Sequence, residues 1–387
     1  MSLPLTVCVV TGSRAEYGLL QWVMHDLRDD PDVTLQVLAT GMHLEPRFGM
    51  TVDQIETDGF RVDARVPLGL DGDAPIDVAR AMGRGVEGVS RALVDLCPDV
   101  MLVLGDRFEI LAAAQAALVH NVPIAHIAGG DVTEGAFDEA IRHALTKMAH
   151  LHLTTNAQSA ARVRQMGEDP ARVHVVGSPG LDHLLRSKLL QGEALETALG
   201  APLGPRNLLV TFHPVTLEAD RGVGELNQLL DALARLPDDL TIWITRPNAD
   251  PGNHAVNAAL DAWAGDRPQV RLHTSLGQVR YLSLMAQVDA VVGNSSSGLY
   301  EAPSLGVPTV DVGDRQAGRL AATSVIRAPA EADAVDAAIR RALDTDASGT
   351  VNPYGDGRSA GRIVAALKAA PRGPALLRKT FHEVTHD

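Results

Sequence analysis

The sequence has few cysteines, few aromatic residues and no long apolar segment. Its two cysteines, Cys8 and Cys97, cannot form the disulfide framework of a small secreted domain. No stretch of about 18 uninterrupted apolar residues occurs, which argues against a membrane-spanning helix. The N-terminal apolar run is short and follows no basic segment, so it predicts a first strand rather than a signal peptide. These absences predict a cytoplasmic protein.

Positive charge is scarce as well. The chain has 48 acidic residues against 34 lysines and arginines, which gives a formal net charge of -14. Such a charge argues against binding to nucleic acid or to an anionic membrane surface. A few focused arginines are enough to bind a small anion, so the expected partner is a small molecule.

The 387 residues do contain a regular alternation of short apolar runs with longer amphipathic segments. Segments 77–96, 107–120 and 138–149 carry apolar residues at helical spacing. This alternation is typical of βαβ units, so it predicts an α/β fold with two Rossmann-like domains. The predicted strands are 5–10, 33–39, 99–105, 122–128, 151–155, 172–177, 207–212, 240–245, 269–273, 289–294 and 308–313.

A polar region at 186–206 marks the expected domain boundary, and its end, 201–206, is the expected linker. Segment 65–76 is expected to form a surface loop. The predicted domains are an N-terminal catalytic domain over residues 1–185 and a C-terminal nucleotide-binding domain over 186–370, with a tail or helix over 371–387.

Cofactor motifs are missing. Residues 11–18, after the first predicted strand, do not form GxGxxG, which argues against a nicotinamide or flavin cofactor. The histidines lack the HExxH or CxxC spacing of metal sites, so neither a metal nor another cofactor is expected. Arg14 instead stands at a helix N-terminus, which suits an anionic ligand. The alternative is a solvated arginine in a turn.

Carboxylates follow two further strands of the first domain, where open α/β sheets bind ligands. Asp106 and Arg107 follow the strand at 99–105, and the alternative for Asp106 is a helix N-cap. Asp131 follows the next strand after two glycines, which let the backbone approach a ligand closely.

The helix that begins near Asp138 carries further charged residues. Asp138 and Arg142 are one turn apart, as are Glu139 and His143, so each pair shares a face. The alternative is a pair of ordinary ion pairs on a helix surface.

The second domain has polar residues after its strands and a Ser-Ser-Ser-Gly segment that predicts a phosphate cradle at a helix N-terminus. Glu301, one turn into that helix, would bind ribose hydroxyls, and its alternative is a capping box. This division between domains predicts a nucleotide-sugar enzyme. The expected nucleotide ligands are His213, Asn248, Ser295, Ser296, Ser297, Gly298, Glu301 and Arg315.

Six motifs, in order, resemble the hydrolysing UDP-N-acetylglucosamine 2-epimerases of bacterial sialic- and legionaminic-acid biosynthesis. They are TGSRAEYG, LGDRFEIL, HIAGGDVTEGAFDEAIRH, FHPVT, GNSSSGLYEAPSLGVPTVDVGDRQAGR and NPYGDGRSAGRI. The resemblance implies a GT-B-like pair of Rossmann-like domains with the substrate in the cleft between them. It also implies elimination of the nucleotide across C1–C2 to a glycal, followed by hydration to the free manno-configured sugar.

Matched motif by motif, the family implies carboxylate roles for Asp106, Asp131 and Asp138, with His143 assisting. It implies phosphate contacts for Arg14, Arg107, His213, Ser295, Ser296 and Arg315, and nucleoside contacts for Asn248 and Glu301. Many relatives have Glu where this chain has Asp131, so its role as base or sugar ligand stays open.

The resemblance also leaves alternatives. The sugar is either N-acetylglucosamine or a 2,4-diacetamido-2,4,6-trideoxyglucose, linked to UDP or GDP, and relatives are commonly dimers or tetramers. The alternative activities are a GT-B glycosyltransferase and a non-hydrolysing 2-epimerase.

Overall fold

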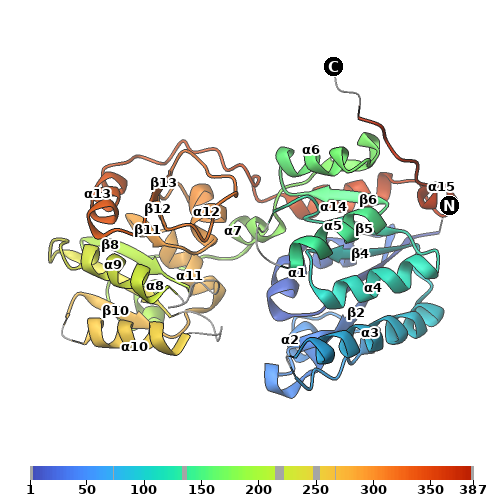
Figure 1. Cartoon of the computed structure of the whole chain (residues 1–387), viewed down its shortest axis with the longest axis horizontal. Coiled ribbons are helices and arrows are strands. Elements are labelled where there is room, and N and C mark those ends of the chain that lie inside the picture. Colours follow the sequence, from blue (N-terminus) through green and yellow to red (C-terminus); the bar gives the residue numbers. More distant parts are fainter. Residues whose placement is uncertain are drawn as a thin grey trace. The chain divides into compact units, whose positions relative to one another are not determined.

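The computed structural model of the chain describes residues 3–72, 74–132, 137–213, 222–246, 253–265 and 267–384. It forms two compact units, each built around one parallel sheet (Figure 1). Unit 1 comprises Met1–His183 and Tyr354–Asp387, and unit 2 comprises Leu184–Pro353. The α/β fold with two Rossmann-like domains is thereby confirmed.

Unit 1 contains a seven-stranded sheet in the order β3-β2-β1-β4-β5-β6-β7. The strand order reverses between β1 and β4, which is where such sheets bind ligands. The strands are β1 (Leu5–Thr11), β2 (Val33–Thr40), β3 (Ala64–Val66), β4 (Val100–Leu104), β5 (Ile124–Ile127), β6 (Leu151–Thr154) and β7 (Val173–Val175). The helices are α1 (Arg14–Asp29), α2 (Val52–Thr57), α3 (Pro75–Leu96), α4 (Phe108–Val119), α5 (Asp138–Met148), α6 (Ala157–Gln165), α14 (Ser359–Ala369) and α15 (Pro374–Leu377), with α7 (Asp182–Arg186) at the boundary.

Unit 2 contains a six-stranded sheet in the order β10-β9-β8-β11-β12-β13, which reverses between β8 and β11. The strands are β8 (Arg206–Thr211), β9 (Leu240–Thr245), β10 (Val270–His273), β11 (Ala290–Gly293), β12 (Thr309–Val312) and β13 (Val325–Ala328). The helices are α8 (Gly192–Leu199), α9 (Val223–Leu233), α10 (Asn253–Ala264), α11 (Gly277–Met285), α12 (Ser297–Tyr300) and α13 (Ala332–Leu343).

The central strands are largely apolar because helices cover both faces of each sheet. In β1, Val7 and Val9 join the core under α1, whereas Cys8 and Val10 join the core on the opposite face. Alternation in side-chain direction therefore fills two cores from one strand. This packing fixes the strand ends that carry the polar residues.

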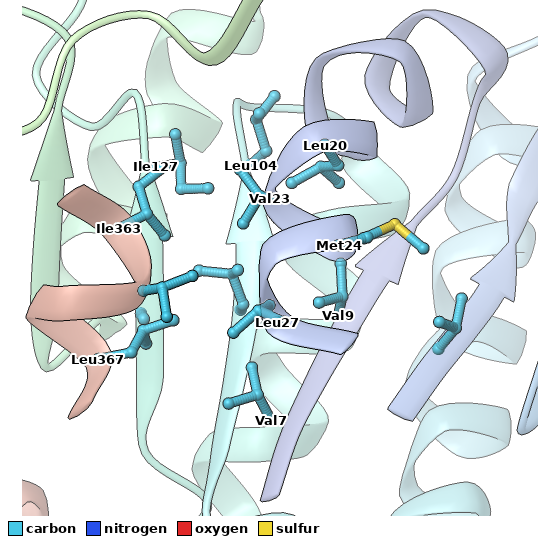
Figure 2. Close-up of a cluster of buried hydrophobic side chains, with 14 of the residues drawn as sticks. Val7, Val9, Leu20, Val23, Met24, Leu27, Leu104, Ile127, Ile363 and Leu367 are labelled. Atoms are coloured by element: carbon cyan, nitrogen blue, oxygen red, sulfur yellow. The ribbon is translucent and has the colours of Figure 1, made fainter. Parts of the chain in front are cut away.

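The C-terminal segment belongs to unit 1, which corrects the expected domain limit at residue 370. Figure 2 shows Ile363 and Leu367 of α14 beside Leu27 of α1 and Ile127 of β5. The carboxylate of Asp182 accepts hydrogen bonds of 2.8 Å from the backbone N–H groups of Ser359 and Ala360, so it caps α14. The apolar face of α14 is thus buried in unit 1.

Three local expectations also differ from the structure. Segment 65–76 is not entirely a loop, because β3 includes its first residues and α3 begins at Pro75. The polar boundary region contains α8, and the expected linker at 201–206 lies inside unit 2. The sequence pattern does not indicate β3 or β13, since both are short edge strands with partly exposed side chains.

Among the described residues, no helix combines the length and the apolar character needed to cross a membrane.

Candidate functional site

Three aspartates lie near the carboxyl edge of the unit 1 sheet. Asp106 lies between β4 and α4, and Asp131 follows β5. Because β4 and β5 are neighbouring parallel strands, both aspartates emerge at the same edge. Asp138 is the first residue of α5. The structure therefore brings together the strand ends that the sequence singles out.

Arg142 of α5 anchors this edge. Its side chain is 8% exposed and forms an ion pair with the carboxylate of Asp106. Its Nη1 donates to the backbone oxygen of Asp131 at 2.9 Å and to Oε2 of Glu139 at 3.2 Å. Helical spacing alone does not indicate the partnership with Asp106. The N-cap alternative for Asp106 is wrong, because Arg107 is the N-cap residue of α4.

Asp131 is held from the neighbouring strand end. Its Oδ1 accepts hydrogen bonds from Thr155 Oγ1 at 2.7 Å and from Ser159 Oγ at 2.5 Å. Gly130 has a φ of +80°, and a Cβ there would lie 2.4 Å from the backbone oxygen of Ser159. Only glycine fits this turn, so the second glycine of the motif has a packing reason as well.

Of the two pairs expected on α5, the pair of Glu139 and His143 is present. Nε2 of His143 lies 3.1 Å from Oε1 of Glu139. His126, in β5, donates from Nε2 to the backbone oxygen of Gly105 at 2.7 Å, and burial lowers its pKa to about 4. His126 is therefore a neutral part of the strand-end structure near pH 7.

Arg107 and Asp138 are electrostatically coupled. Burial raises the pKa of Asp138, and the positive charge of Arg107 opposes this shift. A carboxyl group with a raised pKa is suited to proton transfer near neutral pH. Arg14, in contrast, is exposed at the first position of α1.

Unit 2 contains a polar pocket of about 300 Å³ at the carboxyl ends of its strands. It opens near the reversal between β8 and β11 and includes three of the residues expected to bind nucleotide. The lining residues are Thr211, His213, Thr245, Arg246, Thr274, Ser275, Leu276, Gly277, Gln278, Tyr281, Ser295 and Ser297.

Several hydroxyl groups that line this pocket are hydrogen-bonded to one another in a chain. Tyr281 is hydrogen-bonded to Ser297 at 2.7 Å and to Thr211 at 3.2 Å. Ser297 also lies 3.0 Å from Ser295, and Thr211 lies 2.7 Å from Thr245. Each hydroxyl can donate or accept, so the chain can reorient its protons toward a polar ligand.

Asn294, which follows β11, is hydrogen-bonded to His213, which follows β8. Its side chain accepts from the backbone N–H of His213 at 2.7 Å and donates to the backbone oxygen of the same residue at 2.9 Å. Nη1 of Arg315 and Nε2 of Gln316 donate to the backbone oxygen of Asn294 at 3.0 and 2.9 Å. These contacts fix His213 and Arg315 relative to the serine segment.

The serine segment differs in detail from the expected helix. α12 is a single turn of four residues whose N-cap Ser296 makes no side-chain cap, and Glu301 is its C-cap, so the capping-box alternative is wrong. Burial raises the pKa of Glu301 to about 8. A Cβ on Gly298 would lie 2.6 Å from Thr309 Cγ2, which gives this glycine a packing role.

One expected ligand, Asn248, lies outside the described residues. Tyr281 is a pocket residue that sequence reasoning missed, because it lies inside α11 and not directly after a strand. No group of three or more His, Cys, Asp or Glu side chains able to hold a metal occurs in the described part of the chain.

Comparisons with known proteins show the family of the chain. The family model for UDP-N-acetylglucosamine 2-epimerase matches residues 25–368. A Campylobacter jejuni protein named GDP/UDP-N,N'-diacetylbacillosamine 2-epimerase (hydrolyzing) is 36% identical, over 83% of each chain. A Legionella pneumophila protein named UDP-N,N'-diacetylbacillosamine 2-epimerase (hydrolyzing) is 34% identical, over 96% of this chain and 98% of its own length.

The fold agrees as well. The structure of a Neisseria meningitidis UDP-GlcNAc 2-epimerase bound to UDP-GlcNAc has a TM-score of 0.76 and 20% identity, over 95% of this chain and 100% of its own. The strand orders of both sheets fit the GT-B-like architecture that the sequence predicts. The sequence similarity extends over most of the chain. This protein belongs to the UDP-N-acetylglucosamine 2-epimerase family.

Proposed function

We propose that the protein is a hydrolysing 2-epimerase that converts a nucleoside-diphosphate-linked 2-acetamido sugar into the free manno-configured sugar. The arrangement of Asp106, Asp131 and Asp138 at one sheet edge carries this proposal, because epimerisation needs several proton-transfer groups. Arg142 fixes the first two positions, and Arg107 lies close enough to influence the third. Unit 2 would hold the nucleoside diphosphate in its polar pocket.

In the first step, a carboxylate removes the proton from C2 while the C1–O bond breaks. The C2–H electron pair forms the C1=C2 double bond, and the diphosphate leaves with the C1–O pair. We assign the base to Asp106, since the guanidinium of Arg142 favours its ionised form. Arg107 and Arg315 would stabilise the charge of the departing diphosphate.

In the second step, the base releases the first C2 proton to solvent, and water adds its hydroxyl to C1 of the glycal and gives up its remaining proton to solvent. A new proton is added to C2 on the face opposite to the one that lost the first proton. Asp138 is suited to supply this proton, because burial raises its pKa. Asp131 is held by two hydroxyl donors, which supports a role in binding the sugar. The balance is one water consumed for each nucleotide released.

We propose a 2,4-diacetamido-2,4,6-trideoxy sugar as the substrate. Two similar relatives are named for N,N'-diacetylbacillosamine, and they cover most of this chain. UDP-N-acetylglucosamine is the second candidate, because a Neisseria meningitidis relative named UDP-N-acetylglucosamine 2-epimerase is 31% identical.

Turnover in D2O tests the reaction. We expect the protein, given UDP-N,N'-diacetylbacillosamine, to release UDP and a manno-configured sugar with deuterium at C2, because the added proton comes from solvent. NMR of the sugar product measures both the deuterium at C2 and the configuration at C2. UDP release with the configuration at C2 retained would mean simple hydrolysis. Turnover that starts only after an acceptor is added would mean a glycosyltransferase.

Replacing Arg315 with alanine tests the phosphate site. We expect UDP binding to weaken by about 1–3 kcal/mol, because a charge-assisted hydrogen bond to phosphate is lost. Isothermal titration calorimetry of UDP measures this change. Arg341→Ala, on the exposed side of α13, is the matched control and should bind UDP normally. If both variants bound UDP with equal affinity, Arg315 would not be a phosphate ligand.

A further inference from the structure

Two carboxylates are buried under the sheet edge that carries the proposed sugar chemistry. Glu16, in the first turn of α1, is 4% exposed, and Glu109, in the first turn of α4, is 1% exposed. Because β1 and β4 are neighbouring strands, both helices begin at the point where the strand order reverses. The proposed reaction uses neither residue, so their burial needs another reason.

Hydrogen bonds at the N-terminus of α1 explain the burial of the Glu16 side chain. Its Oε2 accepts from the backbone N–H of Gly12 at 2.7 Å, and its backbone N–H donates to Oγ of Ser13 at 3.4 Å, in the manner of a capping box. Burial and the charge of nearby Glu109 raise the pKa of Glu16 to about 8. Glu16 is therefore mostly neutral at pH 7 and needs no counter-ion.

Among the described residues, Arg107 is the side chain that contacts the buried Glu109 carboxylate. Oε1 of Glu109 accepts from Nε of Arg107 at 2.5 Å. A Cβ on Gly12 would lie 2.5 Å from Cγ of Glu109, and one on Gly41 would lie 3.3 Å from its Oε1, so backbone covers the carboxylate closely. The Glu109 side chain is 0% exposed, whereas that of Arg107 is 39% exposed. The ion pair thus joins the buried carboxylate of Glu109 to the partly exposed guanidinium of Arg107.

This contact determines which part of the guanidinium is available. Glu109 binds the Nε edge, and the contact that we find for the Nη groups, within the described residues, is Nη2 with the sulfur of Met42 at 3.6 Å. A thioether is a weak acceptor, which a phosphate oxygen can replace. Burial lowers the pKa of Arg107, but the carboxylates around it, Glu109 foremost, together raise it above its ordinary value, so Arg107 stays charged.

We infer that Glu109 is a positioning residue that holds Arg107 by Nε and presents its two Nη groups to the diphosphate of the substrate. The inference rests on the proposed function, because it takes a diphosphate as the ligand. An arginine that is already held loses less side-chain entropy when the ligand binds. Its planar Nη pair also matches two phosphate oxygens.

The competing explanation is that Arg107 merely neutralises a buried carboxylate. In that case removing Glu109 would disturb the fold, and its effect on the ligand would not depend on Arg107. A double-mutant cycle separates the two explanations, because it measures the dependence directly.

The experiment measures the Kd of UDP by calorimetry for the full chain and for Glu109→Gln, Arg107→Ala and the double variant. Glutamine keeps the shape of Glu109 but removes its charge. We expect Glu109→Gln to raise the Kd about fivefold to tenfold, which corresponds to the ordering of one long side chain. In the Arg107→Ala background the same substitution should change the Kd less than about twofold, because the residue that it positions is gone.

Glu87→Gln is the matched control, since Glu87 forms an exposed ion pair with Arg91 on α3, and its Kd should equal that of the wild type. If Glu109→Gln does not fold, Glu109→Asp keeps the charge but withdraws it from Nε, and the same cycle applies. An equal loss in both backgrounds, no loss in either, or a wild type that does not bind UDP would overturn the inference. A chain that shows the expected cycle but makes no manno-configured sugar would overturn the proposed function alone.

Discussion

Replacing Asp106 with asparagine is expected to lower kcat by about 10²–10⁴-fold, the usual contribution of a positioned proton-transfer group. Asparagine keeps the shape of the side chain but cannot accept the proton from C2. UDP binding should change little, because the Asp106 carboxylate pairs with Arg142 and is assigned to the sugar, not to the nucleotide. Steady-state kinetics with the nucleotide sugar and calorimetry with UDP measure the two effects separately.

Asp29→Asn is the control for Asp106→Asn. Asp29 also pairs with an arginine, Arg28, but its side chain is 66% exposed at the C-terminal end of α1. Its removal should leave kcat unchanged, since an exposed ion pair contributes little. If Asp106→Asn kept near wild-type kcat, Asp106 would not be the base. The same substitutions at Asp131 and Asp138 would then identify the base.

Replacing Arg142 with leucine is expected to destabilise unit 1 by roughly 3 kcal/mol, because it removes the partner of charges that are largely withdrawn from water. The side chains of Asp106 and Glu139 are only 22% and 26% exposed, and both lose a guanidinium contact. For a unit of this size, that loss corresponds to a fall in Tm of about 6–12 °C. Differential scanning calorimetry measures the shift.

Activity of the Arg142→Leu variant should fall together with its Tm, since Asp106 and the backbone of Asp131 lose a common anchor. Arg91→Leu on the exposed face of α3 is the control, and we expect its Tm to change by less than about 2 °C. A stable Arg142→Leu variant with normal kcat would show that Arg142 holds neither residue.

The sequence determined the fold class and most strand ends. Alternation of apolar runs with amphipathic segments predicts β4, β5, β8 and β11, because strands covered on both faces are mostly apolar. Polar residues that directly follow such strands include Asp106, Asp131 and His213. The motifs around them were enough to identify the family, which the comparisons confirm.

Sequence alone was less informative where a partner is distant along the chain. Arg142 is placed by helical spacing beside Asp138, but its ion pair with Asp106 joins residues 36 positions apart. Glu109 reads as an acidic residue in a first helical turn, and its complete burial under Gly12 depends on how β1 and β4 pack side by side. Tyr281 contributes to the pocket from within a helix.

The sequence by itself therefore determined which residues stand at strand ends and which family this protein belongs to, because local periodicity and contiguous motifs encode both. The tertiary structure alone decided that α14 completes unit 1, that Arg142 holds Asp106, and that Glu109 lies beneath Arg107. These features depend on burial and charge pairing between segments far apart in the chain, and no local pattern carries that information.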